Sequence, residues 1–224
     1  MKTQQSDTFT TDGKRFKFCA IDLPGHGSSE CNAATFESIC DAINEALADL
    51  APVILVGHSY GAAVAATIAR RLGQKTQALL LAAPVGLGGT INSSFLDTLA
   101  SRDSNPLKLG RALAQLTASN EVPPADFVQV LGERLQKRSL QLQEIVKELA
   151  SNGSQNIDIQ KQLEAFIGPT TIIWGRNDKI IDWRESLSVP GNSDHIILAN
   201  TGHMPHIEQP ERFRNIVDSI SEWV

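Results

Sequence analysis

Residues 53–62 read Val53-Ile54-Leu55-Val56-Gly57-His58-Ser59-Tyr60-Gly61-Ala62, a short apolar run that passes directly into a segment of helical pattern. The run is typical of a buried strand, and the alanine-rich segment 60–72, closed by Gly73, is typical of a helix. The junction fits the pattern Gly-x-Ser-x-Gly. A sharp strand-to-helix turn strains the central serine, and glycines on either side let neighbouring chain pass closely. We therefore expect Ser59 to be a nucleophile at the positive end of a helix dipole.

Short apolar runs alternate with helical segments on both sides of this junction. Strands that alternate with helices form a parallel sheet covered by helices on both faces. The sequence thus predicts an α/β fold with a mostly parallel sheet. The predicted strands are residues 17–22, 52–57, 77–83, 170–174 and 195–199, and the predicted helices are residues 35–50, 60–72 and 210–223.

The alternation stops between residues 91 and 166, where the sequence is nearly all helical. We interpret residues 91–166 as a helical lid subdomain, and residues 1–90 and 167–224 as the core. Apolar faces of these helices would shape a pocket for an acyl group, although they also simply pack a lid onto its sheet. Their members are Leu107, Leu109, Leu113, Leu116, Val128, Leu131, Leu135, Leu142, Ile145 and Leu149.

Two loops that follow later strands carry the partners that a serine nucleophile needs. A serine hydroxyl is activated by a base, and the base is oriented by a carboxylate. Asp178 follows one predicted strand and His203 follows the next. In an open parallel sheet both loops lie at the carboxyl ends of the strands, where Ser59 also lies. We therefore predict the triad Ser59, Asp178 and His203, with the backbone N–H of Tyr60 as a donor to the oxyanion.

Other side chains near these positions are alternatives. Asp182 and Glu185 also follow the strand of Asp178, but they lie where a helix begins, and His206 is interpreted as a structural hydrogen-bond partner. No carboxylate or cysteine accompanies His203 and His206 at ligand spacing, so no metal site is predicted. His58 is interpreted as a packed residue that points away from the site, and His26 and His195 are interpreted as turn or surface residues.

Composition narrows the classes of function. The 224 residues, 42% hydrophobic and 20% charged, can bury a sizeable core and exclude a disordered chain. The formal net charge is −5 without a basic stripe, so neither nucleic acid nor an anionic membrane surface is expected as a partner. Cys19, Cys31 and Cys40 form no CxxC pair, so the sequence predicts neither a zinc site nor a disulfide framework. With no apolar leader segment, a cytoplasmic location is expected, and no organic cofactor is predicted.

From Asp-Leu-Pro-Gly-His-Gly at residues 22–27 to Glu-Gln-Pro at residues 208–210, the chain resembles the α/β-hydrolase superfamily of the serine-nucleophile type. The order of serine, aspartate and histidine along the chain is the order in that superfamily. The segment Ala-Pro-Val-Gly-Leu-Gly-Gly-Thr-Ile-Asn at residues 83–92, with the helical lid after it, is similar to acetoin dehydrogenase E2 (dihydrolipoamide acetyltransferase) components in their hydrolase-like C-terminal domain. The resemblance implies an α/β-hydrolase fold and chemistry on esters or thioesters.

The chain departs from these relatives in two respects. It has no lipoyl domain, so we expect no lipoyl arm on it. Only residues 1–16 precede the strand at 17–22, whereas the superfamily places several strands and a His-Gly loop there, and we interpret the fold as N-terminally shortened. That loop supplies a second oxyanion donor, whose loss costs about 10² to 10³ in rate. Lost strands also leave an exposed sheet edge that favours pairing with another chain.

Two classes of function follow. The first is a serine hydrolase or acyl-transferring enzyme that acts on a small ester or thioester through an acyl-enzyme. The second is a weakly active or inactive hydrolase-like module, related to an acetoin dehydrogenase E2 component and serving as acyltransferase or scaffold. The complete triad favours the first class, and the missing oxyanion loop favours the second. The expected partners are a small-molecule substrate and, through the sheet edge, a second copy or a component of a multienzyme complex.

Overall fold

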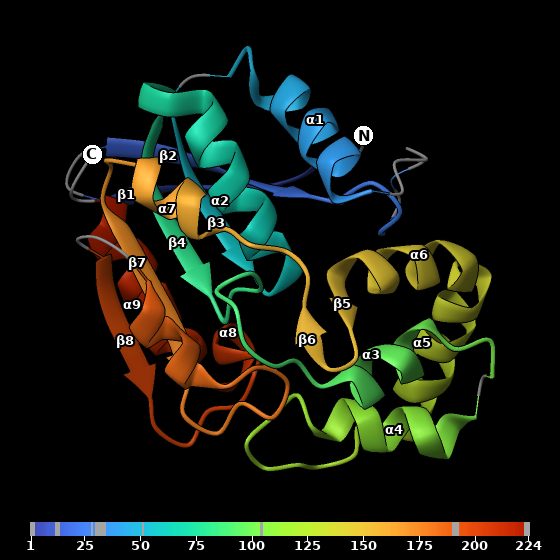
Figure 1. Ribbon diagram of the computed structural model, residues 1–224. Helices are drawn as coiled ribbons and strands as arrows, with labels where there is room; N and C mark the ends of the chain where they lie inside the picture. Colours follow the sequence, from blue (N-terminus) through green and yellow to red (C-terminus); the bar gives the residue numbers. More distant parts are fainter. Residues whose placement is uncertain are drawn as a thin grey trace.

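The computed structural model describes residues 3–11, 14–27, 29, 35–50, 52–103, 105–189 and 193–221, without the side chains of residues 3–16 and 221. Within this part of the chain, four parallel strands form the central sheet, which confirms the prediction (Figure 1). Their order across the sheet is β3 (Val53–His58), β4 (Thr76–Ala82), β7 (Thr170–Gly175) and β8 (Ser193–Leu198).

Helices cover both faces of this sheet (Figure 1). On one face α2 (Tyr60–Leu72) packs against β3 and β4, with α1 (Phe36–Leu47) beside it and α7 (Gln160–Ala165) in contact with it. On the other face lies α9 (Pro210–Ser221), preceded by the short helix α8 (Pro205–Glu208). Helix α2 begins and ends at the predicted residues, because Gly73 adopts φ 56° and stops it.

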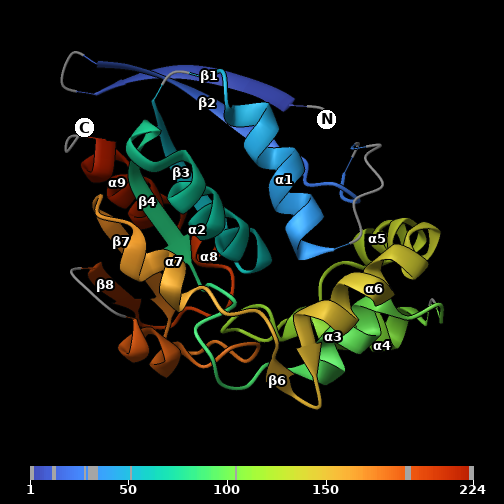
Figure 2. The same ribbon diagram turned by 45° about the horizontal axis from the view of Figure 1, so that its top comes forward.

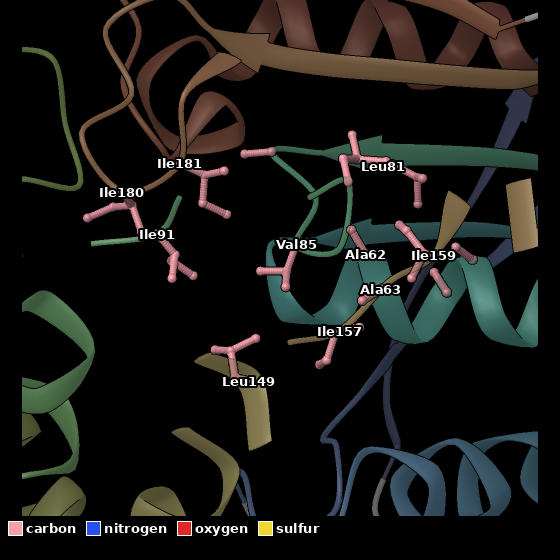
Figure 3. Close-up of a cluster of buried hydrophobic side chains, with 14 of the residues drawn as sticks. Ala62, Ala63, Leu81, Val85, Ile91, Leu149, Ile157, Ile159, Ile180 and Ile181 are labelled. Carbon is pink, nitrogen blue, oxygen red and sulfur yellow. The ribbon is translucent and has the colours of Figure 1, made fainter. Parts of the chain in front are cut away.

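Alternation along β4 places its side chains in two different cores. Leu79 and Leu81 pack with the alanines of α2, whereas Ala78 and Leu80 pack toward Ile220 of α9. All four β4 side chains are fully buried, as expected for a central strand. Figure 3 shows that the core under α2 continues past the end of the sheet, through Val85, Ile91, Ile157 and Leu149.

A group of helices and a short hairpin lie to one side of the sheet (Figure 1). They are α3 (Ser93–Ala100), α4 (Pro106–Ala114), α5 (Ala125–Lys137) and α6 (Ser139–Leu149), with the hairpin of β5 (Ala150–Ser151) and β6 (Ser154–Gln155). We call these elements the cap. The helical character predicted for residues 91–166 is confirmed, although the two-residue strands were not foreseen. Leu109, Leu113 and Val128 form the cap's own core, whereas Leu107 is 74% exposed. The division of the chain into core and lid stays a prediction.

The prediction of a strand at residues 17–22 is confirmed, but its place in the central parallel sheet is wrong. The strand is β2 (Lys14–Ile21), which pairs antiparallel with β1 (Thr3–Thr11) in a separate two-stranded sheet (Figure 2). Residues 17–20 are exposed, with Phe18 at 47%, whereas a strand of a sheet covered by helices on both faces would be buried. The physical reason is that, among the described residues, no strand pairs with the other edge of β2.

Some sequence expectations concern residues outside the described ranges, among them Cys31 and Trp223. The two described cysteines, Cys19 and Cys40, are free thiols. Burial raises the pKa of the Cys40 thiol to about 12. None of the helices in the described ranges combines the length and the apolar character that a membrane crossing requires.

Candidate active site

The turn at Ser59 joins β3 to α2 and has the strained backbone that the sequence predicts. Ser59 lies at φ 52° and ψ −120°, a region that residues with a side chain rarely occupy. Its N–H donates to Ala82 O at 2.9 Å, and its carbonyl accepts from Ala62 N–H at 3.0 Å. The neighbouring strand and the first turn of α2 therefore hold the serine in this conformation.

The two glycines of the Gly-x-Ser-x-Gly pattern differ in what they do. A Cβ on Gly57 would lie 2.5 Å from Gly61 O and 2.6 Å from Ala62 Cα, so a side chain there would collide with the start of α2. A Cβ on Gly61 would meet no described atom within 4 Å outside its own helix backbone and its chain neighbours. The expectation of a close approach is therefore confirmed for Gly57 and wrong for Gly61, because no neighbouring segment lies where a side chain of residue 61 would point.

Asp178 and His203 come together as the sequence predicts. His203 Nδ1 lies 2.8 Å from Asp178 Oδ2, and the two side chains are 3% and 0% exposed. Because a carboxylate oxygen only accepts, Nδ1–H is the donor, and in the neutral form of the ring the other nitrogen, Nε2, carries the lone pair. That tautomer is the one a general base needs.

Asp178 is held in place by three further donors. Its Oδ1 accepts from the backbone N–H groups of Ile180 at 2.8 Å and Ile181 at 3.1 Å. Its Oδ2 accepts from Trp174 Nε1 at 3.0 Å. Trp174 is completely buried, and its contact with Asp178 is a part of the site that the sequence prediction does not include. A tryptophan at a strand end, four residues before the carboxylate, was the available signal.

No hydrogen bond joins the Ser59 hydroxyl to His203 in the described part of the structure. Their loops nevertheless meet through His58, whose Nε2 lies 2.7 Å from His203 O and whose ring centroid lies 4.8 Å from that of His203. Burial lowers the pKa of His58 to about 3, and its neutral Nε2–H donates to the carbonyl. His58 is therefore packed, as expected, but it contacts the base loop instead of pointing away from the site.

The alternatives to the predicted triad have other contacts. His206 packs against His58 and Phe213, and burial together with His203 lowers its pKa. Asp182 accepts from Arg184 N–H at the start of a 3-10 helix, residues 183–188, and Glu185 accepts from Gln155 Nε2 at 2.7 Å. His26 stacks on Tyr60 with centroids 6.5 Å apart, and His195 pairs with Ser193 on the surface, as expected of turn and surface residues.

The backbone N–H of Tyr60 stays a predicted donor to the oxyanion. It is the first residue of α2, so its N–H has no partner within the helix, and no other described residue accepts from it. It lies at the positive end of the helix dipole, next to the serine. Among the described residues, no cluster of three or more histidine, cysteine or carboxylate side chains could hold a metal ion.

Comparison with known proteins identifies the family of this chain. The model of the Alpha/beta hydrolase family matches residues 8–216. The dihydrolipoyllysine-residue acetyltransferase component of the acetoin cleaving system of Pseudomonas putida is 30% identical over an alignment of 205 positions that covers 86% of this chain and 53% of that protein. The chain thus spans about half the length of this relative, and the resemblance to acetoin components is confirmed.

Two further matches are informative. Putative esterase/lipase 2 of Mycoplasma pneumoniae is 28% identical over an alignment of 229 positions that covers 94% of this chain and 80% of that protein. The structure of a meta-cleavage product hydrolase from Pseudomonas fluorescens IP01 superposes with a TM-score of 0.78 at 16% identity, over 92% of this chain and 80% of that one. The latter likeness concerns the fold, and it agrees with the family match. The chain belongs to the α/β hydrolase family.

Proposed function

We propose that this protein is a serine hydrolase that cleaves a small ester or thioester through an acyl-enzyme. The observation that carries the proposal is the buried hydrogen bond between Asp178 and His203, in which three further donors hold Asp178 in place, beside the strained turn of Ser59. Burial of such a pair costs desolvation energy, and a buried titratable group with a specific partner is a candidate for a functional site. The relatives named as esterases or lipases support the same chemistry.

In the first half of the reaction, Ser59 Oγ attacks the carbonyl carbon of the substrate while its proton passes to His203 Nε2. The negative charge that develops on the carbonyl oxygen is stabilised by Tyr60 N–H and the dipole of α2. Asp178 stabilises the imidazolium without taking its proton. When the tetrahedral intermediate collapses, the alcohol or thiol leaves with the proton from His203, and the acyl group remains on Ser59.

In the second half, water attacks the acyl-enzyme. His203 takes a proton from this water and returns it to Ser59 Oγ as the acid is released. The cap would exclude bulk water and shape an apolar pocket above the serine. The side chains that continue the core beyond the sheet, such as Val85 and Leu149, support an apolar environment on this side.

Transfer of the acyl group to a thiol is the second candidate. The observation in its favour is the relative from Pseudomonas putida, which is named as an acetyltransferase component. The acyl-enzyme would be the same, and a thiolate would replace water in its second half. A module that binds partners without turnover remains the opposite expectation, and it predicts no reactive serine.

The test is covalent labelling by a fluorophosphonate probe, read by intact mass. We expect the purified protein to gain one adduct and the Ser59→Ala variant to gain none. Hydrolysis of p-nitrophenyl acetate, with and without a small thiol acceptor, then separates hydrolase from transferase by the product formed. A folded protein that gains no adduct would contradict both enzymatic candidates.

A further inference from the structure

The carboxylate of Glu208 lies between the loop that carries His203 and a loop of the cap. Glu208 is the last residue of α8, which directly follows the base-bearing loop. Its Oε1 accepts a hydrogen bond from Gly202 N–H at 2.8 Å, and its Oε2 accepts one from Ala118 N–H at 2.7 Å. One side chain therefore ties the residue that precedes His203 to the cap.

Direct backbone contacts join the same two loops. The N–H of His203 donates to Leu116 O at 2.8 Å. A Cβ on Gly202 would lie 2.8 Å from backbone atoms of residues 116–118, so the loops meet with no room for a side chain between them. The peptide groups of His203 are thus held from two sides, the carbonyl by His58 and the N–H by the cap.

The cap loop, residues 115–120, follows α4 and is also tied to the rest of the protein at both ends. Gln115 Oε1 accepts from Asn92 Nδ2 at 2.8 Å, and Asn120 Oδ1 accepts from Lys179 Nζ at 3.0 Å. In Figure 1 the yellow-green chain after α4 extends from the cap helices toward the end of the sheet that carries α8. A displacement of this loop would therefore break its hydrogen bonds to His203 N–H and to Glu208.

We propose that Glu208 is a positioning residue that couples the docked cap to the catalytic base, so that His203 is held in its productive place while residues 115–120 are bound. The inference rests on the proposed function and deepens it. Glu208 acts through Gly202 and His203, because their backbone sets where the imidazole lies. A displacement of about 1 Å at a reacting group costs about 10² in rate. Opening of the cap for substrate entry would loosen the base, and closure would restore it.

The experiment compares Glu208→Ala and Glu208→Gln with a matched control, Glu211→Gln, at an exposed position in the first turn of α9. Glutamine keeps one acceptor oxygen and so preserves one of the two hydrogen bonds, whereas alanine preserves neither. Three quantities are measured: the rate of labelling by a fluorophosphonate, kcat and KM for p-nitrophenyl acetate across pH, and the downfield proton resonance of His203 Nδ1–H. The resonance needs no turnover.

We expect Glu208→Ala to lower kcat by about 10² with little change in KM, to shift the pH profile of labelling and to broaden the His203 resonance. The kcat and labelling rate of Glu208→Gln should lie between those of this variant and the wild type. If the alanine variant does not fold, Glu208→Gln alone tests the coupling. Unchanged labelling and an unchanged resonance in folded Glu208 variants would overturn the coupling, as would an equal loss in Glu211→Gln. A wild-type protein that is folded yet never labelled would overturn the proposed function, while the resonance would still test the coupling.

Discussion

Two carboxylates that follow β7 have opposite surroundings. Asp178 accepts four hydrogen bonds and its side chain is completely buried, an arrangement that fixes the carboxylate beside the imidazole of His203. Glu185 accepts one from Gln155, and its Oε1 is buried with no hydrogen-bond partner in the described structure. Burial, and then the charges of Asp182 and Asp178, raise the pKa of Glu185 to about 7, although Gln155 and the Thr90 backbone act to lower it.

This difference predicts how stability depends on pH. Because the folded-state pKa of Glu185 lies above its ordinary value of 4.5, the folded protein binds this proton more tightly than the unfolded chain does. The contribution of this group to stability is complete below pH 4.5 and is lost as the pH rises to about 7. We expect Glu185→Gln to raise the Tm at pH 8 by about 2–4 °C, or about 1 kcal/mol after solvent screening.

The measurement is thermal unfolding at pH 5 and pH 8 at constant ionic strength. The gain should shrink at pH 5, where most of the wild-type carboxyl already carries its proton. Glu121→Gln, at an exposed loop position, serves as the control and should change the Tm equally at both values. A gain for Glu185→Gln that is the same at pH 5 and pH 8 would refute the assignment.

At the scale of elements, the junction of β3 and α2 depends on one of its two glycines. The start of α2 passes so close to Gly57 that any side chain there must push strand and helix apart, whereas the position of Gly61 is open. Gly61 also lies at the beginning of a helix, where alanine is favoured over glycine. The two residues look equivalent in the sequence pattern, but they are subject to different constraints.

We therefore expect Gly57→Ala to destabilise the protein by about 1–3 kcal/mol, because an overpacked backbone contact must relax. The matched variant Gly61→Ala should be neutral or gain up to about 1 kcal/mol. Urea unfolding of both variants and the wild type measures the difference. Equal destabilisation by the two substitutions would show that the approach at Gly57 is not what the strand-to-helix turn requires.

Elements with strong local patterns could be predicted from the sequence. Helix α2 was predicted to the residue, because its alanines and Gly73 are local signals. Local patterns could not show that β2 pairs only with β1 among the described residues, because strand pairing is decided far along the chain. The same holds at the site: Asp178 and His203 could be predicted from their loops, whereas the contact of Ala118 with Glu208 joins residues 90 positions apart.

At the scale of the whole molecule, β3 forms one edge of the central sheet within the described ranges. Its sequence, Val-Ile-Leu-Val-Gly-His, has high strand propensity and carries no Lys, Arg, Asp or Glu, and Val56 is 43% exposed. Natural proteins protect such edges with charges, prolines or covering elements. The expectation that another chain pairs with this edge therefore stays a proposal, with a second copy or a complex component as the partner.

Pairing through this edge predicts association that depends on concentration. We expect the purified protein to elute above monomer mass at high concentration, and Val56→Lys to shift it toward monomer, because a charge on an edge strand opposes pairing. Leu140→Lys, at a position in the cap that is 63% exposed, is the control for removal of an exposed apolar side chain. Light scattering after size exclusion measures the mass. The same mass distribution for both variants would argue against β3 as the interface.

The two ends of the cap lie side by side, since Ile91 N–H donates to Gly153 O at 2.9 Å and Thr90 pairs with Ser154. An inserted segment whose ends meet adds little closure entropy to the fold that receives it. We therefore propose that the cap can be exchanged as a unit, so that substrate preference diverges while the sheet and the loops of Ser59, Asp178 and His203 stay intact. A grafted replacement would have to reproduce three contacts: the amide of Gln155 that joins the cap to the loop after β4, the peptide N–H that meets Glu208, and the carbonyl that accepts from His203 N–H.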